Sequence, residues 1–300
     1  MLVATLQQRL MDADTLLLRR QYVRAEARYG EVIEGAQACV DVDLEVAARA
    51  MLVRSLLFMR RPEEAHAHLR EAESSRERVR RETQARLWGS LVRYARVMCP
   101  SEEADALAES YLSWAERHGL GSALLDACLL RCHTLPSAQR ANRIERVLAL
   151  VRPMHRSTRL EAQAERRLAQ SLEAIDEPWL ARDAYRRAGE RYEALGQVRA
   201  FLLMTWAVAT LCCKMEDWSA AARCMERLLP GVEPGGPHPE LGAMVYTIQG
   251  RICLARGDDV GGRQAISEGL RSARESGPSM VPPGIHAELL RLADRFGERG

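Results

Sequence analysis

The chain has 300 residues, of which 47% are hydrophobic and 28% are charged, fractions that are ordinary for a soluble folded protein. Its 43 basic and 41 acidic side chains leave a formal charge of +2, so no overall field draws it to nucleic acid or anionic lipid. Aromatic residues make up only 5%, which disfavours a β-sandwich or β-barrel and favours helices.

Lys214 is the only lysine, a bias that we attribute to a GC-rich, bacterial coding sequence. The first ten residues, MLVATLQQRL, lack the charged and apolar regions of a signal peptide. No stretch approaches the eighteen apolar residues of a membrane span; the richest, from Phe201 to Cys213, has 13. The eight cysteines lie mostly in apolar helical stretches, without the spacing of a disulfide framework. We therefore expect a cytoplasmic protein with reduced cysteines and no membrane partner.

A pattern of small and aromatic residues recurs along the chain, beginning with Tyr22, Ala25 and Tyr29. Its central residues, which we call the anchors, follow one another every 37 to 41 residues, at Ala25, Ala65, Ala104, Ile144, Ala181, Ala221 and Gly262. Twelve positions before each anchor lies another residue, usually small: Ala13, Val53, Val92, Cys132, Ala169, Ala209 and Gly250. Small residues at such points allow two helices to pack closely. The spacing predicts a helical hairpin around each anchor.

Residues typical of helix starts separate the predicted helices. Pro62 and Pro178 fall in first turns, and Asp176 and Asp217 are predicted to cap helix N-termini.

Two segments lie outside the predicted hairpins. The proline- and glycine-rich residues 230–239 are predicted to form an irregular loop between the sixth and seventh hairpins. The amphipathic stretch IHAELLRLADRF predicts a capping helix at about residues 283–297. A single solenoid domain of residues 1–300 accommodates all of these elements.

These residues resemble the tetratricopeptide repeat family, whose signature has small residues at repeat positions 8 and 20. The residues from Ala255 to Asp258, followed by Gly262, match that signature well. The resemblance covers about residues 4 to 275, and the period near 40 differs from the family's usual 34, as in some bacterial regulators. It implies an all-α fold, a right-handed α-solenoid of about seven antiparallel helical hairpins with a C-terminal capping helix.

The resemblance also implies a concave groove lined by the first helix of each hairpin. Transferred through the anchors, the partner-binding residues are Arg54, Phe58, Arg93, Arg96, Arg166, Trp206 and Arg251. Because a guanidinium group binds a carboxylate through two hydrogen bonds, we expect the groove to receive an acidic or C-terminal segment of another protein. The alternative is that these arginines are solvated or pair with neighbouring glutamates, as Glu165 or Glu173 would for Arg166.

No catalytic, metal or nucleic-acid motif stands out. The sequence has no GxSxG, phosphate-binding loop, HExxH or GxGxxG pattern, so we predict no enzymatic activity and no cofactor. Cys128 and Cys132 share a helix face, but His133 points elsewhere and no fourth ligand is evident, so we interpret both cysteines as core residues. The arginines between positions 76 and 81 alternate with glutamate and have no aromatic residues for base stacking.

The sequence therefore favours a non-catalytic scaffold, adaptor or regulatory subunit that binds a partner protein or peptide. The alternative is a ligand- or peptide-responsive sensor that acts through a separate effector protein. The identity of the partner and the oligomeric state stay open.

Overall fold

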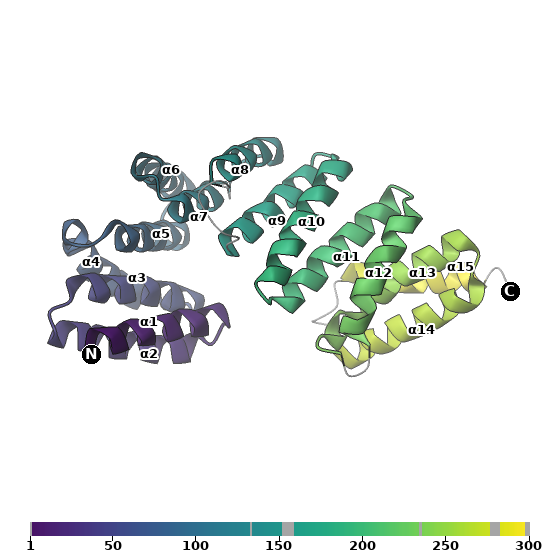
Figure 1. The fold of residues 1–300 in the computed structure, drawn as a ribbon, viewed down its shortest axis with the longest axis horizontal. Helices are drawn as coiled ribbons and strands as arrows, with labels where there is room; N and C mark the ends of the chain where they lie inside the picture. The colour runs from purple at the N-terminus through teal and green to yellow at the C-terminus, as the bar shows by residue number, and fades with distance from the viewer. Residues whose placement is uncertain (1, 133, 152–158, 234–235, 277–282, 298–300) are drawn as a thin grey trace. The chain divides into compact units, whose positions relative to one another are not determined.

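The computed structural model of the chain describes residues 2–132, 134–151, 159–233, 236–276 and 283–297. Fifteen α-helices and two short 3-10 helices follow one another along these residues, and no strand occurs among them (Figure 1). This confirms the predicted all-α class. None of the described helices has the length and apolar character needed to cross a membrane.

The helices group into two compact units, which are described separately. Unit 1 comprises Met1–Pro136 and Arg143–His155, and unit 2 comprises Ser137–Asn142 and Arg156–Gly300. Unit 1 contains α1 (Leu2–Leu18), α2 (Tyr22–Ala38), α3 (Val42–Phe58), α4 (Pro62–Ser74), η1 (Arg76–Arg78), α5 (Arg81–Met98), α6 (Ser101–His118) and α7 (Gly121–Arg131). Residues of α8 (Ser137–Val151) belong to both units. Unit 2 contains α9 (Arg159–Glu173), α10 (Pro178–Ala194), α11 (Val198–Lys214), α12 (Trp218–Val232), η2 (Pro239–Leu241), α13 (Gly242–Arg256), α14 (Asp259–Ser276) and α15 (Pro283–Gly297).

Six of the seven predicted hairpins occur as packed helix pairs among the described residues, whereas α7 and α8 of the predicted fourth hairpin do not pack on each other. Direct packing joins α1 to α2, α3 to α4, α5 to α6, α9 to α10, α11 to α12 and α13 to α14, whereas α7 packs on α5 and α6. The first helices of successive pairs also touch: in unit 1, α3 contacts α1 and α5, and α5 contacts α7. We call α1, α3, α5 and α7 the first-helix layer of unit 1. In unit 2 the corresponding contacts join α11, α13 and α15.

The anchors explain why the helices pack this closely. All seven are buried, and Ala25, Ala65, Ala181 and Ala221 have no exposed surface. The residues twelve positions earlier are buried as well, including Ala13, Val53, Val92, Ala169 and Ala209 with no exposed surface. A larger side chain at these crossings would push the helices apart, because protein interiors are packed without spare volume.

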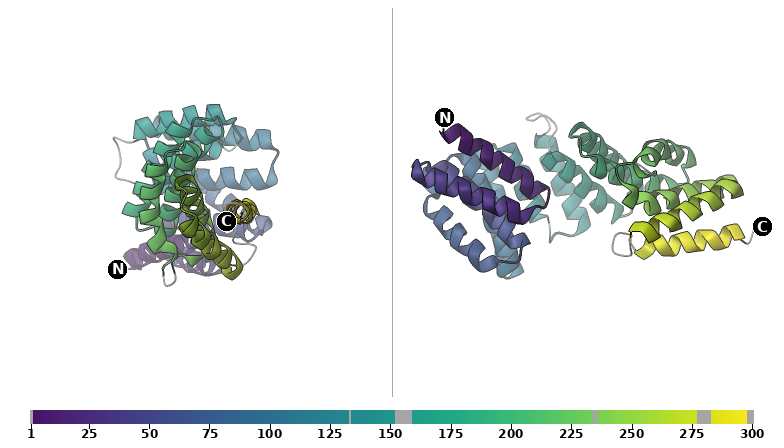
Figure 2. Two further views of the ribbon diagram at one scale, coloured as in Figure 1. Left: turned by 90° about the vertical axis from the view of Figure 1, so that its right-hand side faces the viewer. Right: turned by 90° about the horizontal axis from the view of Figure 1, so that it is seen from below.

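Helix α15 packs on α13 and α14 at the C-terminal end of unit 2 (Figure 2, right). Phe296, which is 1% exposed, lies directly over the anchor Gly262. A Cβ atom built on Gly262 would lie 2.1 Å from Cζ of Phe296, so no other residue fits beneath this ring.

The irregular segment predicted at 230–239 begins later than expected. Helix α12 continues through Pro230 and ends at Val232. Pro230 cannot donate to the carbonyl of Glu226, but both residues lie on the exposed face of α12, where water can donate to that carbonyl instead.

One predicted N-cap is confirmed and one is wrong. Oδ1 of Asp217 accepts a hydrogen bond of 3.0 Å from the backbone N–H of Ala220, in the first turn of α12. Asp176 instead lies in the preceding turn with φ of 57°, and α10 begins at Pro178. Aspartate is one of the few residues that tolerate this left-handed conformation, which explains its presence in the turn.

Val40, between α2 and α3, is a β-branched residue with φ of 59°. The turns after α6 and α10 have glycine in this conformation, Gly119 and Gly196. We expect Val40→Gly to raise the free energy of unfolding by about 0.5–1 kcal/mol, because the strain exceeds the entropy that glycine loses on folding. Urea denaturation measures the change. Gly196→Val is the matched reverse, with no atom near the new Cβ, and should lower stability by about 1 kcal/mol. Loss of stability in Val40→Gly would contradict the expectation.

Candidate functional site

The first-helix layer of unit 1 contains a group of charged side chains, which we call the arginine cluster. It consists of Asp14 from α1, Arg54 from α3, Arg86 and Arg93 from α5, and Asp126 from α7. Three guanidinium groups face two carboxylates, so one positive charge is in excess. The structure thus brings together Arg54 and Arg93, which the sequence predicted to share one face.

Arg93 and Asp126 form a two-pronged ion pair between α5 and α7. Nη2 of Arg93 lies 2.6 Å from Oδ1 of Asp126, and Nη1 lies 3.2 Å from Oδ2. Burial alone would raise the pKa of Asp126, but Arg93 and Arg54 outweigh it and hold this pKa below its ordinary value. Burial lowers the pKa of Arg93, but Asp126 more than compensates and raises it. The positive charge of Arg93 is therefore neutralised within the protein.

Arg54 has no such partner. Its Nε donates to the hydroxyl of Ser90 at 3.2 Å, and its Nη2 lies 4.0 Å from Asp126, beyond hydrogen-bond distance. Burial, and then repulsion from Arg93, lower the pKa of Arg54 to about 10. The side chain is nevertheless 19% exposed, so part of it is accessible from outside. Arg93 and Arg86 have closer carboxylate partners than Arg54, so we assign the excess positive charge of the cluster to Arg54.

Arg86 and Asp14 close the other side of the cluster. Nη1 of Arg86 lies 3.2 Å from Oδ2 of Asp14, and Tyr29 donates its hydroxyl hydrogen to Oδ1 of Asp14 at 2.8 Å. Burial and the adjacent carboxylate raise the pKa of Tyr29 well above its usual value, so the phenol keeps its proton. Asp14 thus has Tyr29 and Arg86 as its partners, and no ion pair joins it to Arg54.

Gly89 of α5 allows three of these side chains to converge. A Cβ atom built there would lie 2.6 Å from Oδ2 of Asp126 and 2.8 Å from both Nη2 of Arg54 and Nη1 of Arg93. The backbone carbonyl of Gly89 also accepts a hydrogen bond of 2.7 Å from Arg93. A glycine inside a helix weakens it, so this one indicates that side chains from elsewhere occupy the space. No pattern in the sequence marks Gly89 as part of a site.

The other two residues predicted in unit 1, Arg96 and Phe58, differ in exposure and in their contacts. Arg96 is 17% exposed, and it contacts Asp105 of α6 and the backbone carbonyl of Leu130 in α7. Phe58, at the end of α3, is 62% exposed and stacks on Tyr22 with ring centroids 4.9 Å apart. Arg96 is therefore engaged within the protein, and Phe58 presents an aromatic surface.

In unit 2, two of the three predicted residues also have internal partners. Nε1 of Trp206 donates to the backbone carbonyl of Met244 at 3.1 Å. Arg251 donates from Nε and Nη2 to one oxygen of Glu288, at 3.1 and 2.9 Å.

Arg166 differs, because its buried Nε has no hydrogen-bond partner among the residues that the structure describes. The two glutamates considered for it have other partners. Glu165, fully buried, lies 3.0 Å from Nε of Arg187, and Glu173 accepts from the hydroxyl of Tyr185 at 3.1 Å. The structure thus gives each of these two glutamates a partner other than Arg166.

Four of the predicted residues share one structural role. Arg54 reaches from α3 to α5, Arg93 from α5 to α7, Trp206 from α11 to α13, and Arg251 from α13 to α15. The partner lies 33 to 38 residues later in each case, which is close to one repeat. A search of the sequence at the repeat period of 37 to 41 residues would have found Glu288, but not Ser90 or Asp126.

Cys128 and Cys132 are core residues, as predicted: both are buried, and their sulfur atoms lie 3.8 Å apart, too far for a disulfide. His133 lies outside the described residues. Across the parts of the chain that the structure describes, no three histidine, cysteine, aspartate or glutamate residues form a group that could hold a metal ion.

No family model and no curated protein matches the chain, but solved structures do. A signal-transduction ATPase with a tetratricopeptide repeat sensor from Pyrococcus horikoshii has a TM-score of 0.65 at 15% identity, over 96% of this chain and 44% of that one. The apo form of the quorum sensor NprR from B. thuringiensis has a TM-score of 0.52 at 11% identity, over 97% and 80%. The C-terminal part of a TPR repeat-containing protein from Cytophaga hutchinsonii has a TM-score of 0.54 at 12% identity, over 93% and 99%. The likeness is one of fold: the chain is a tetratricopeptide-repeat-like α-solenoid.

Proposed function

We propose that this tetratricopeptide-like solenoid is a non-catalytic interaction module, a scaffold, adaptor or regulatory subunit that binds an acidic segment of a partner protein. The observation that carries the proposal is the excess positive charge of the arginine cluster. A buried cation that shares its only nearby carboxylate with a second arginine is unfavourable, as the lowered pKa of Arg54 reflects. A carboxylate from a partner would supply the missing charge.

The surroundings of Arg54 favour a peptide over a free ion. Arg54 and Phe58 are four residues apart on α3, so both side chains lie on one side of the helix. A segment with a carboxylate next to an apolar side chain would pair with the guanidinium group and cover the exposed ring of Phe58. Arg166 of unit 2 stays a candidate partner-binding residue on the argument from the repeat positions.

A sensor is the second candidate function. Two of the structures with this fold are described as sensors, one of them within a signal-transduction ATPase, and this supports a regulatory role. A sensor would bind a short peptide or small ligand and act through a separate effector, whereas an adaptor would bind a folded protein. Calorimetry with short peptides and affinity capture with the whole chain separate the two functions. Binding of a short peptide would favour the sensor, and capture of a folded protein would favour the adaptor.

The test of the binding site is Arg54→Gln, which removes the excess charge but keeps the ion pair between Arg93 and Asp126. We expect wild-type protein to bind fluorescein-labelled octaglutamate, and we expect Arg54→Gln to lower this affinity about tenfold, because one charge-assisted hydrogen-bond pair is lost. Fluorescence anisotropy at low salt measures both affinities. The control is Arg70→Gln, an exposed arginine on α4 outside the first-helix layer, which should bind as wild type does. Equal affinity in Arg54→Gln and wild type would contradict the proposed site.

Charge reversal at both Arg54 and Arg93 is not a suitable test. Two new glutamates would stand beside Asp126, which is 14% exposed, and the fold would not be retained. Loss of binding in that variant would report unfolding.

A further inference from the structure

A second site of a different kind lies in unit 2, away from the first-helix layer. A cavity of about 360 Å³ opens between α10 and α12, with α11 as its floor. It is at the small end of the volumes of about 300–1,000 Å³ that are typical of small-molecule sites. The cavity therefore suits a small molecule and is too small for a folded partner.

The floor of the cavity is largely apolar. Phe201 and Val208 of α11 line it, together with Cys212 of α11 and Cys224 of α12. Burial raises the pKa of both thiols, that of Cys224 to about 11, so both are neutral at physiological pH. Neutral buried thiols behave as small hydrophobic groups. A ligand would place its apolar part on this floor.

The rim of the cavity carries four arginines, three of which already have acidic partners. Arg182 lies 3.4 Å from Asp183, Arg186 lies 2.6 Å from Glu190, and Arg227 lies 2.8 Å from Glu193.

Arg223 of α12 is the fourth. Among the described residues, no acidic group lies within ion-pair distance of Arg223, and its side chain is exposed at the rim. One cation thus stands free beside an apolar floor.

The neighbouring hairpin provides a natural comparison. A cavity of about 500 Å³ occupies the equivalent place between α12 and α14, over α13. Its lining includes Glu233 and Glu268, and its one arginine, Arg271, is paired with Glu268 and Glu275. The same architecture therefore offers an acidic cavity one repeat later, where no cation is free among the lining residues that the structure describes.

We propose that the cavity between α10 and α12 binds a small amphipathic carboxylate, with its carboxylate on Arg223 and its apolar part on Phe201 and Val208. The charged group selects anions and the floor selects a short hydrocarbon chain. Such a ligand would bridge α10 and α12 across α11 and would stabilise their packing, so its binding is coupled to the stability of unit 2. This inference does not depend on the proposed partner site in unit 1.

The test uses sodium octanoate as the probe, titrated into the full chain by isothermal calorimetry. We expect binding of octanoate with at least tenfold preference over octylammonium, because only the anion pairs with Arg223. Arg223→Ala should lower the octanoate affinity about tenfold. Val208→Trp should abolish binding by filling the cavity, with far-UV circular dichroism as the check of its fold.

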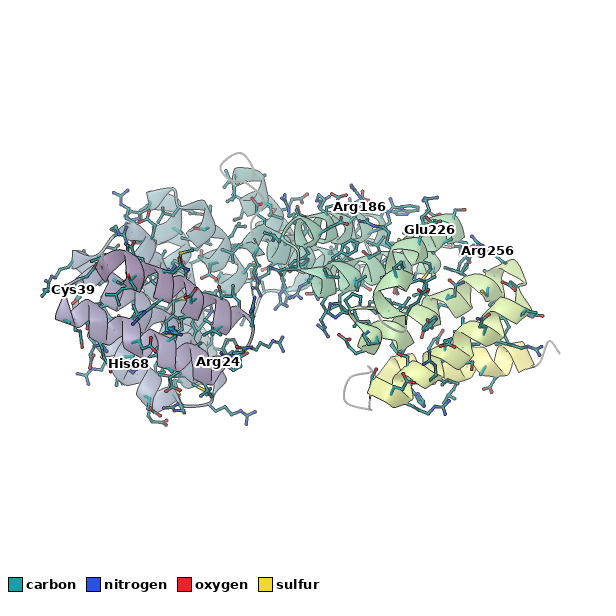
Figure 3. The ribbon with its side chains drawn as sticks, turned by 60° about the horizontal axis from the view of Figure 1, so that its bottom comes forward. Arg24, Cys39, His68, Arg186, Glu226 and Arg256 are labelled. Atoms are coloured by element: carbon teal, nitrogen blue, oxygen red, sulfur yellow. The ribbon has the colours of Figure 1, made fainter. Side chains whose placement is uncertain are left out.

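Figure 3 shows Arg256 at the end of α13, an exposed arginine outside both cavities, and Arg256→Ala should bind octanoate as wild type does.

A second measurement locates the ligand. Octanoate should slow the alkylation of Cys224 by N-ethylmaleimide several-fold, as measured by peptide mass spectrometry. The alkylation rates of Cys39 and Cys99, half-buried thiols of unit 1, should not change, so these two cysteines are the internal controls. The proposal is wrong if octanoate does not bind, if octylammonium binds equally well, or if Arg223→Ala keeps the wild-type affinity. This last outcome tests the site even if Val208→Trp fails to fold.

Discussion

Asp126→Ala should lower the free energy of unfolding by about 3 kcal/mol, because removing one partner of a buried ion pair leaves the other charge uncompensated. The change would leave Arg93 and Arg54 facing each other over Gly89 with no carboxylate between them. Urea denaturation at pH 7, followed by circular dichroism, measures the loss. A loss below about 1 kcal/mol would mean that the cluster contributes little to stability.

Two comparisons separate this effect from an ordinary surface ion pair. Glu31→Ala removes an exposed partner of Arg28 in the same unit and should cost less than about 1 kcal/mol. Adding Arg54→Gln to Asp126→Ala should restore part of the stability, because it removes the excess charge. Additive losses in the double variant would contradict the assignment of that charge to Arg54.

The loss in Asp126→Ala should also depend on pH with a defined sign. The pKa of Asp126 is lowered in the folded state, so its contribution is fully present above the ordinary carboxyl pKa of about 3.9. It is lost as the pH falls through the lowered value in the folded protein. The difference between wild type and variant should therefore narrow below about pH 4 and stay constant from pH 6 to 8.

Phe296→Ala should lower the free energy of unfolding of unit 2 by about 3–5 kcal/mol, because it empties the space over Gly262. The ring packs with Cys253, Ile266 and Leu292 in one hydrophobic cluster. Helix α15 is attached there by two of its residues, so we expect its amides to exchange with deuterium faster in the variant. Thermal denaturation and hydrogen exchange with mass spectrometry measure the two effects.

Leu290→Ala is the matched control on the same helix. Its side chain is 48% exposed, and the change should cost less than about 1 kcal/mol and leave hydrogen exchange in α15 unaltered. Equal losses in the two variants would show that α15 is held by its whole length and not by Phe296.

The repeat pattern predicted the fold because small residues at helix crossings are visible in a sequence. Ala25, Ala65 and Ala181 are buried without exposure, as a period of about 40 residues requires. The residues that cap helices were harder to predict, because aspartate occurs both at helix N-caps and in left-handed turn positions. Asp176 and Asp217 have similar surroundings in the sequence, yet only Asp217 caps its helix.

The candidate site was only partly predictable. Helical periodicity places Arg54 and Arg93 on equivalent faces of α3 and α5, and the structure brings them together. It does not say which acidic residue of another helix reaches them, and Asp126 showed no motif of its own. Asp126 neutralises Arg93, whose Nη2 lies 2.6 Å from Oδ1, and not Arg54, whose Nη2 lies 4.0 Å from Oδ2. No sequence pattern encodes this difference in distance.

The contacts that run from one first helix to the next have a consequence for engineering. In many repeat proteins each module can be exchanged or duplicated, because every repeat packs on its neighbours through a similar interface. Here the hairpin of α5 and α6 depends on a specific carboxylate supplied by α7, and α13 depends on one supplied by α15. A consensus module inserted at either junction would separate donor from acceptor, so grafts into this array must transfer hairpins together with the helix that follows them.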